Sequence, residues 1–256
     1  LSLAAGALFI WKYEVSKKSF TRYWPLIAVI FVVILGMHIR LTDYRWEYLR
    51  NIDSYAFMRE MELIVENGIL QTTDPLFFRS PFEETLTAPL DFNPYWYLRA
   101  PYQYFGAYSY IFVNMFIPSL QLWEYLIYLP PILASLSAIP MYYVGKLLYD
   151  RKAGVLAALF YIMDISNLSR SLAGDPDTDA VVMLMPAIVM AFYLLMYKRI
   201  DLLNKIDKRV LLYAFFASLS LALWQNVWAG YWYILWLLTG FLLIKTVMNF
   251  ITTTGM

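Results

Sequence analysis

Six apolar stretches, each long enough to cross a lipid bilayer, determine what this chain can fold into. A membrane-spanning helix needs about 20 consecutive residues that are mostly apolar. The six stretches cover approximately residues 24–41, 126–147, 153–171, 180–197, 210–226 and 229–248. Charged residues make up only 15% of the chain, too few to give a soluble domain a polar surface. The sequence therefore predicts an all-α fold, a polytopic bundle of transmembrane helices in an integral membrane protein.

The largest segment outside these stretches, residues 42–125, is predicted to form one large loop. The opening run of residues 1–11 is too short to span alone, and we interpret it as the end of a cut helix or as an interfacial segment. From the way the sequence opens and closes, we expect a fragment of a longer protein. A net charge of +1 gives no argument for nucleic-acid binding, and the lack of cysteine excludes a thiolate metal site or a cysteine nucleophile.

Basic residues collect on one side of the predicted membrane path. When alternate loops are assigned to opposite sides, one side receives 13 of the 20 Lys and Arg residues, including every lysine. The opposite side receives 15 of the 19 Asp and Glu residues. Because Lys and Arg accumulate in cytoplasmic loops, the acidic side is predicted to be extracytoplasmic. The large loop and the turns at residues 174–179 and 224–231 then face outside, and so does any active site built from them.

The most specific local pattern is the alternation of three aspartates between the third and fourth stretches. Asp175, Asp177 and Asp179 follow Arg170 and Gly174 there. Carboxylates one residue apart suit a hard divalent cation such as Mg²⁺ or Mn²⁺, which prefers oxygen ligands. Alternatively, Asp and Thr before an apolar run cap the free N–H groups of the next helix and complement its dipole. The residues alone leave both interpretations open, and Asp179 is able to serve in both.

Two further motifs lie on the predicted outer side, and neither is specific when taken alone. In residues 53–59 an Asp and an Arg enclose an aromatic residue, and residues 228–231 read Trp-Ala-Gly-Tyr. In this order and topology, the three motifs resemble the N-terminal membrane part of the oligosaccharyltransferase catalytic subunit, of the single-subunit archaeal and bacterial type. The most specific element of the resemblance is the spacing Arg-x-x-x-Gly-x-x-Asp-Thr-Asp at residues 170–179. The resemblance covers nearly the whole chain after Phe20.

This resemblance implies a membrane domain like that of C-type glycosyltransferases, and it implies an enzyme. Members of the family transfer an oligosaccharide from a polyprenyl phosphate or diphosphate carrier, such as dolichyl diphosphate, to Asn of Asn-x-Ser/Thr in acceptor proteins. The implied function is protein N-glycosylation by a metal-dependent oligosaccharyltransferase. The implied partners are a lipid-linked oligosaccharide donor, an acceptor polypeptide with that sequon, and membrane lipids, without nucleic acid.

The resemblance also assigns the site residues. Asp53, Asp177 and Asp179 are implied as metal ligands and catalytic carboxylates, with Mn²⁺ or Mg²⁺ as the cofactor. Carboxylates that bind the protons of the acceptor amide weaken its conjugation, while a metal ion stabilises charge on the departing phosphate. Arg170 is implied as a catalytic residue beside the site, because its planar guanidinium suits a carboxylate or the lipid phosphate. Asp175 lies outside the family pattern, and we do not expect it to be a metal ligand.

Parts of the family pattern do not occur in these residues. The C-terminal soluble domain, whose Trp-Trp-Asp-Tyr-Gly motif reads the Ser or Thr of the sequon, is absent. The further outer loop that carries a catalytic glutamate in relatives is absent as well. We therefore expect this chain alone to be inactive, with an incomplete metal shell and no sequon pocket. Ser54 also stands where relatives often have proline.

Two other functions compete with this interpretation. The first is another membrane glycosyltransferase that uses polyprenyl-phosphate sugars, such as a protein O-mannosyltransferase, which also places acids in the first outer loop. The second is a non-enzymatic transporter or assembly subunit. Transporters tend to show internal repeats and polar residues at mid-membrane, whereas the acids here gather at one side and no repeat is visible.

Overall fold

The structure is a computed structural model, which describes residues 17–42, 44, 48–70, 100–203 and 205–254. The run of residues 1–11 and much of the large predicted loop, residues 71–99, lie outside the described residues. The described residues are mainly helical and contain no strand, which confirms the prediction of an all-α bundle. The helices are α2 (Lys17–Thr42), α3 (Ile52–Asn67), α4 (Pro101–Asn114), α5 (Leu122–Leu136), α6 (Ala138–Leu148), α7 (Arg151–Met163), α8 (Ile165–Ser169), α9 (Asp179–Leu203), α10 (Lys208–Gln225), the 3-10 turn η2 (Ala229–Tyr231) and α11 (Trp232–Thr254).

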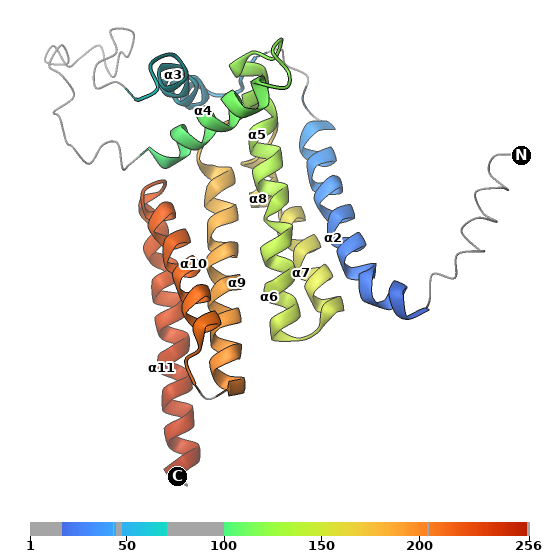
Figure 1. Ribbon diagram of the computed structural model, residues 1–256, viewed down its shortest axis with the longest axis vertical. Helices are drawn as coiled ribbons and strands as arrows, with labels where there is room; N and C mark the ends of the chain where they lie inside the picture. Colours follow the sequence, from blue (N-terminus) through green and yellow to red (C-terminus); the bar gives the residue numbers. More distant parts are fainter. Residues whose placement is uncertain (1–16, 43, 45–47, 71–99, 204, 255–256) are drawn as a thin grey trace, which may run out of the picture.

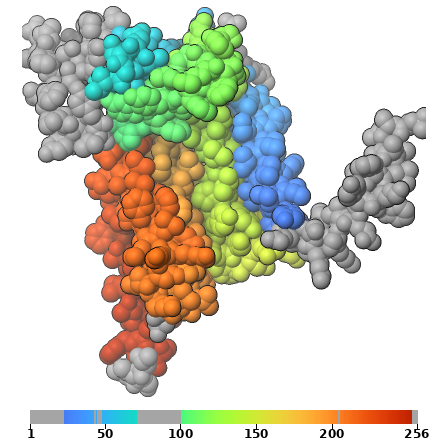
Figure 2. All heavy atoms as spheres, in the orientation of Figure 1, coloured from blue at the N-terminus to red at the C-terminus, as the bar shows by residue number. Residues whose placement is uncertain are grey.

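The long helices share one direction, and two shorter helices cover one end of them. In Figure 1, α2, α5, α6, α7, α9, α10 and α11 run along the long axis of the molecule, while α3 and α4 lie across one end. Figure 2 shows α3 and α4 as a cap over that end of the bundle. Both capping helices belong to the long loop between the first two apolar stretches. We call the covered end the capped end.

Four helical segments are long and apolar enough to cross a bilayer by length and composition. They are Tyr23–Thr42, Leu122–Leu148, Asp179–Leu203 and Ala229–Thr252. Each contains one of the six predicted spans almost completely. The other two predicted spans correspond to α7 with α8 and to α10, which pack on α6 and α9 respectively. The six-span membrane path therefore stays a prediction for these two segments.

Aspartates fix where several helices begin. Asp150 accepts a hydrogen bond from the Ala153 N–H at the start of α7, at 2.8 Å. Asp164 ends α7 and starts α8, because its carboxylate accepts from the N–H groups of Ser166 and Asn167 at 3.0 and 3.1 Å. Side-chain acceptors of this kind satisfy N–H groups that have no partner inside the helix. The predicted span at residues 153–171 is consequently divided into two helices.

A buried apolar cluster lies at the capped end and joins its elements. It contains residues of α3, α4, α5 and the start of α9, together with Ala173 from the turn that precedes α9. Met61 is fully buried within it, and a Cβ on Gly106 of α4 would lie only 2.5 Å from the Met61 sulfur. A larger residue at position 106 would force the Met61 side chain to move, so α4 packs closely on α3 at this point. The cluster thereby fixes both capping helices against the turn that carries the three aspartates.

Candidate active site

The turn between α8 and α9 is anchored to three other parts of the chain. The Gly174 carbonyl accepts a hydrogen bond from the Arg50 N–H at 2.7 Å, and the Gly174 N–H donates to the Ile127 carbonyl of α5 at 3.1 Å. The Ala173 N–H donates to the Arg40 carbonyl of α2 at 3.2 Å. These backbone contacts fix the position of the turn before any of its side chains is considered.

Arg40 holds the same turn through its side chain. It lies in the last turn of α2 and is only 1% exposed. Its Nε donates to Ser171 Oγ at 2.7 Å, and its two Nη atoms donate to the carbonyls of Ile162 and Gly36 at 3.0 and 3.2 Å. Ile162 lies in the last turn of α7, where carbonyls have no partner inside the helix. Arg40 thus satisfies the end of α7 and ties α2 to the aspartate turn.

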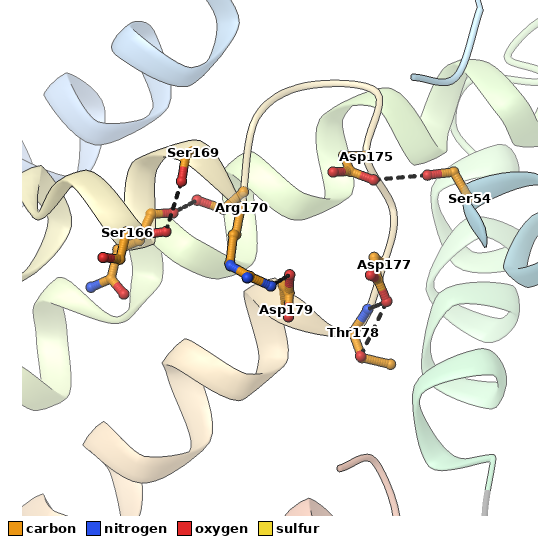
Figure 3. A network of polar contacts seen from close by, with 10 residues as sticks. Ser54, Ser166, Ser169, Arg170, Asp175, Asp177, Thr178 and Asp179 are labelled. Carbon is orange, nitrogen blue, oxygen red and sulfur yellow. Dashed lines mark hydrogen bonds and ion pairs between the residues drawn. The ribbon is translucent and has the colours of Figure 1, made fainter. Parts of the chain in front are cut away.

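The three alternating aspartates make three different contacts. Asp179 accepts a hydrogen bond from Arg170 at 3.2 Å, and the two side chains form an ion pair. Asp177 accepts through Oδ1 from the backbone N–H and the hydroxyl of Thr178. Asp175 accepts from the hydroxyl of Ser54 at 2.9 Å. Figure 3 shows Arg170 reaching Asp179 while Asp175 points to Ser54. Among the described residues, neither Asp177 nor Asp179 accepts a hydrogen bond from an N–H group within α9. Their carboxylates instead accept from Thr178 and Arg170.

The contact between Ser54 and Asp175 brings the first acidic motif to the second. Asp53 precedes Ser54 in the first turn of α3, where its negative charge complements the helix dipole. Its side chain is exposed and makes no hydrogen bond or ion pair with any residue that the structure describes. The structure thus brings the segment of Asp53 to the capped end beside the aspartate turn. It places Arg170 directly against Asp179, whereas Asp53, Asp177 and Asp179 do not form a group close enough to hold a metal ion.

Electrostatics at the turn favour a positive partner. Burial raises the pKa of Asp177, hydrogen bonds from Thr178 act against this, and the negative charges of Asp179 and Asp175 add to the increase in pKa. The carboxylates of Asp175 and Asp179 are therefore close enough to repel that of Asp177. Arg170 pairs with Asp179, but its side chain is 68% exposed, so water weakens its effect on the turn. A bound cation would relieve this repulsion.

The residues present fit a hard divalent cation in their chemistry, because carboxylate oxygens are the ligands that Mg²⁺ and Mn²⁺ prefer. The structure does not gather these carboxylates around one position. Within the described part of the chain, no group of three or more Asp, Glu or His side chains is close enough to hold an ion. The assignment of Asp53, Asp177 and Asp179 as metal ligands thus stays a prediction.

Two residues shape this site although no sequence motif marks them as part of it. Ser54 was noted only as a departure from the family pattern, yet its hydroxyl joins α3 to Asp175. Arg40 contributed only to the charge distribution of the outer side. The sequence does contain a signal for Arg40, because an arginine within an apolar span is rare and needs specific polar partners.

Replacing Gly174 by alanine is expected to displace the turn. Gly174 has a φ of 80°, and a Cβ there would lie 2.8 Å from Cε2 of Tyr44. The left-handed conformation alone costs a residue with a Cβ about 1–2 kcal/mol, and the contact with Tyr44 adds to it. Gly68→Ala is the matched control, because Gly68 has a φ of 76° but nothing within 4 Å of its added Cβ.

Thermal unfolding of the full-length protein in detergent measures this difference. Gly174→Ala should lower the unfolding midpoint more than Gly68→Ala does, and it should also slow any reaction that uses the aspartate turn. Equal midpoints and equal rates for the two variants would contradict the close packing of Tyr44 on Gly174.

Fold and site together define a polytopic integral membrane protein whose acidic turns gather at one end of its helical bundle. The sequence profile of a family described as oligosaccharyl transferase STT3, N-terminal, matches residues 25–255. Because the match covers most of the sequence, the chain belongs to this family, which confirms the resemblance found in the sequence. A comparison with curated proteins gave no match.

Two solved structures are similar in fold. One is the archaeal oligosaccharyltransferase AglB from Archaeoglobus fulgidus in complex with an inhibitory peptide and a dolichol-phosphate, with a TM-score of 0.66. The other is the apo form of the Archaeoglobus fulgidus oligosaccharyltransferase, with a TM-score of 0.63. Each is 21% identical to this chain and matches 84% of it, and the chain covers 25% of each. The chain thus spans about a quarter of the length of these proteins.

Proposed function

We propose that this chain is the N-terminal membrane part of an oligosaccharyltransferase that glycosylates asparagine. The enzyme would transfer an oligosaccharide from a polyprenyl phosphate or diphosphate carrier to Asn of Asn-x-Ser/Thr. The observation that carries the proposal is the convergence of two acidic motifs at the capped end, through the hydrogen bond between Ser54 and Asp175. Membership of the oligosaccharyl transferase family gives this convergence its chemical meaning and favours it over an O-mannosyltransferase or a transporter.

The chemistry makes specific demands on the residues of this end. The amide nitrogen of the acceptor forms a bond to the anomeric carbon, the bond from that carbon to the phosphate oxygen breaks, and the nitrogen loses a proton. Asp53 is exposed and has no partner among the described residues, so its carboxylate is available to accept hydrogen bonds from the acceptor amide. Such bonds weaken the conjugation that makes an amide a poor nucleophile.

Arg170 serves the leaving group in this proposal. Its guanidinium is exposed and pairs with Asp179, so it reaches solvent while remaining held at the turn. A guanidinium binds phosphate through two parallel hydrogen bonds, which suits a lipid phosphate at the membrane surface. Asp53, Asp177 and Asp179 would hold the divalent cation, Mn²⁺ or Mg²⁺. When bound, this cation supplies stabilisation of negative charge on the departing phosphate.

The proposed partners and location follow from the same chemistry. The Archaeoglobus structure in complex with an inhibitory peptide and a dolichol-phosphate supports a peptide acceptor and a lipid-linked donor for this protein too. The polyprenyl chain stays in the hydrocarbon while its phosphate reaches the surface, where the capped end lies at the ends of the apolar helices. We assign this end to the extracytoplasmic face of a six-span path, because the lysines all fall on the opposite side.

Glycan transfer by the full-length protein tests the proposal. The assay uses a lipid-linked oligosaccharide donor and two peptides that differ only in carrying Asn-x-Thr or Gln-x-Thr. Glycopeptide is expected from the Asn peptide alone, is lost after treatment with EDTA and returns with Mn²⁺. Transfer to the Gln peptide would point instead to hydroxyl glycosylation. Undiminished transfer after EDTA treatment would contradict the metal dependence.

A further inference from the structure

Tyr102 is a buried phenol for which the proposed chemistry has no role so far. It lies in the first turn of α4 and is only 2% exposed. Its ring packs edge-on against the ring of Phe57 in α3, with 5.7 Å between the centroids and 82° between the planes. The ring therefore has a clear packing role, whereas its hydroxyl is buried and finds no hydrogen-bond partner among the residues that the structure describes.

An unpaired buried hydroxyl destabilises a protein, because it loses its hydrogen bonds to water and gains none in return. Phenylalanine would fill the same space without that loss. Packing alone thus gives no reason for tyrosine at this position. Either the hydroxyl gains a partner in another state of the protein, or it is a pure cost to stability.

Tyr102 belongs to the same buried cluster as Ala173 and Ala180, the residues on either side of the aspartate turn. Burial raises the pKa of Tyr102 well above its ordinary value, and the charges of Asp177 and Asp175 raise it further. The packing explains why they are near. Ser54 and Phe57 lie one turn apart on α3, so that α3 binds Asp175 with one residue and Tyr102 with the other.

Asp177 has an oxygen available for this hydroxyl. Its Oδ1 accepts from the N–H and the hydroxyl of Thr178. Its Oδ2 accepts no hydrogen bond from the described residues, although the side chain is half-buried. A buried donor without an acceptor and a half-buried acceptor without a donor thus both lie at the capped end, beside the aspartate turn.

We propose that the Tyr102 hydroxyl donates a hydrogen bond to the Asp177 carboxylate when a divalent cation is bound, and that it thereby sets the orientation of this carboxylate in the site. The inference rests on the proposed function, since it takes Asp177 as a ligand of the cation. Tyr102 is a positioning residue in this account, because it touches neither the substrates nor the ion. Partners that hold a ligand in this way typically contribute about 10–100-fold to metal affinity or activity.

Mn²⁺ binding to the full-length protein in detergent tests the inference, with the signal of free Mn²⁺ followed by electron paramagnetic resonance. Tyr102→Phe should raise the dissociation constant for Mn²⁺ about 10–100-fold. It should raise the Mn²⁺ concentration for half-maximal glycan transfer by a similar factor, with a smaller change in the rate at saturating Mn²⁺. The melting temperature of the metal-free variant should equal or exceed that of the wild type, because an unpaired hydroxyl has been removed.

Tyr193→Phe is the matched control. Its hydroxyl in α9 is also buried without a partner among the described residues, but it lies 14 residues beyond Asp179, about 21 Å along the helix. Mn²⁺ binding and glycan transfer should be unchanged in this variant. A wild-type dissociation constant in Tyr102→Phe would overturn the inference and leave the proposed function intact. A lower melting temperature of metal-free Tyr102→Phe would also overturn it, by showing a structural partner. Failure of the wild type to bind Mn²⁺ would overturn both.

Discussion

Asp177→Ala is expected to lower the rate of glycan transfer by the full-length protein about a thousandfold or more. A metal ion that stabilises charge on the leaving group is worth several kcal/mol, and about 1.4 kcal/mol corresponds to a tenfold change in rate. Asp177 lies between the other two aspartates of the turn, and its half-buried carboxylate experiences the charges of both. Its removal should therefore weaken the binding of the cation. Glycopeptide formation from a lipid-linked donor measures the effect.

Two variants separate charge from shape in this experiment. Asp177→Asn keeps the size of the side chain and an oxygen that accepts from Thr178, but it loses the negative charge, so transfer should remain nearly as low. Asp201→Ala removes a charge at the opposite end of α9, where Asp201 is exposed and lies 3.8 Å from Lys245. That variant should transfer at the wild-type rate. A rate within tenfold of the wild type for Asp177→Ala would exclude this residue from the chemistry.

Asp53→Ala should cause a comparable loss of transfer with little loss of stability. Asp53 is exposed and has no partner among the described residues, and its removal costs only the interaction with the dipole of α3, about 0.3–1 kcal/mol. The folded protein should therefore persist while the acceptor amide and the cation lose a carboxylate. Transfer rate and melting temperature of the same preparation distinguish these two effects.

Ser54→Ala gives the opposite pattern and serves as the comparison. Ser54 is fully buried, and its hydrogen bond to the Asp175 carboxylate is worth about 1.5–3 kcal/mol. Stability should fall while part of the transfer rate remains, because no reacting group is removed. Full activity of Asp53→Ala, with Ser54→Ala impaired, would assign this segment a purely structural role.

The fold was predictable because its signal is local. An apolar stretch of about 20 residues specifies a helix and a membrane environment without reference to any other part of the chain. The start of α8 was harder to predict, since Asp164 acts there as a helix cap within a stretch that otherwise reads as continuous. An aspartate inside an apolar run has two competing interpretations, a functional acid and a helix cap, and the sequence does not decide between them.

The sequence allowed the acidic residues of the candidate site to be picked out, but not the contacts that join their segments. Arg170 and Asp179 are close in sequence, and the structure pairs them, whereas the family resemblance implied only that Arg170 lies beside the site. The contacts that build the site instead join distant residues, Ser54 with Asp175 and Arg40 with Ser171, which are 121 and 131 positions apart. No periodicity within one segment encodes such contacts, because they depend on how the helices pack.

The central claim is that carboxylates from two separate segments bind one cation at the capped end. An anomalous difference map of full-length protein crystals grown with Mn²⁺ tests it most directly. We predict one peak within about 2.5 Å of carboxylate oxygens of Asp53, Asp177 and Asp179, the range of metal–oxygen bonds in proteins. A bound Mn²⁺ elsewhere in a protein that transfers glycan, or a peak that leaves Asp53 or Asp177 uncoordinated, would contradict the account.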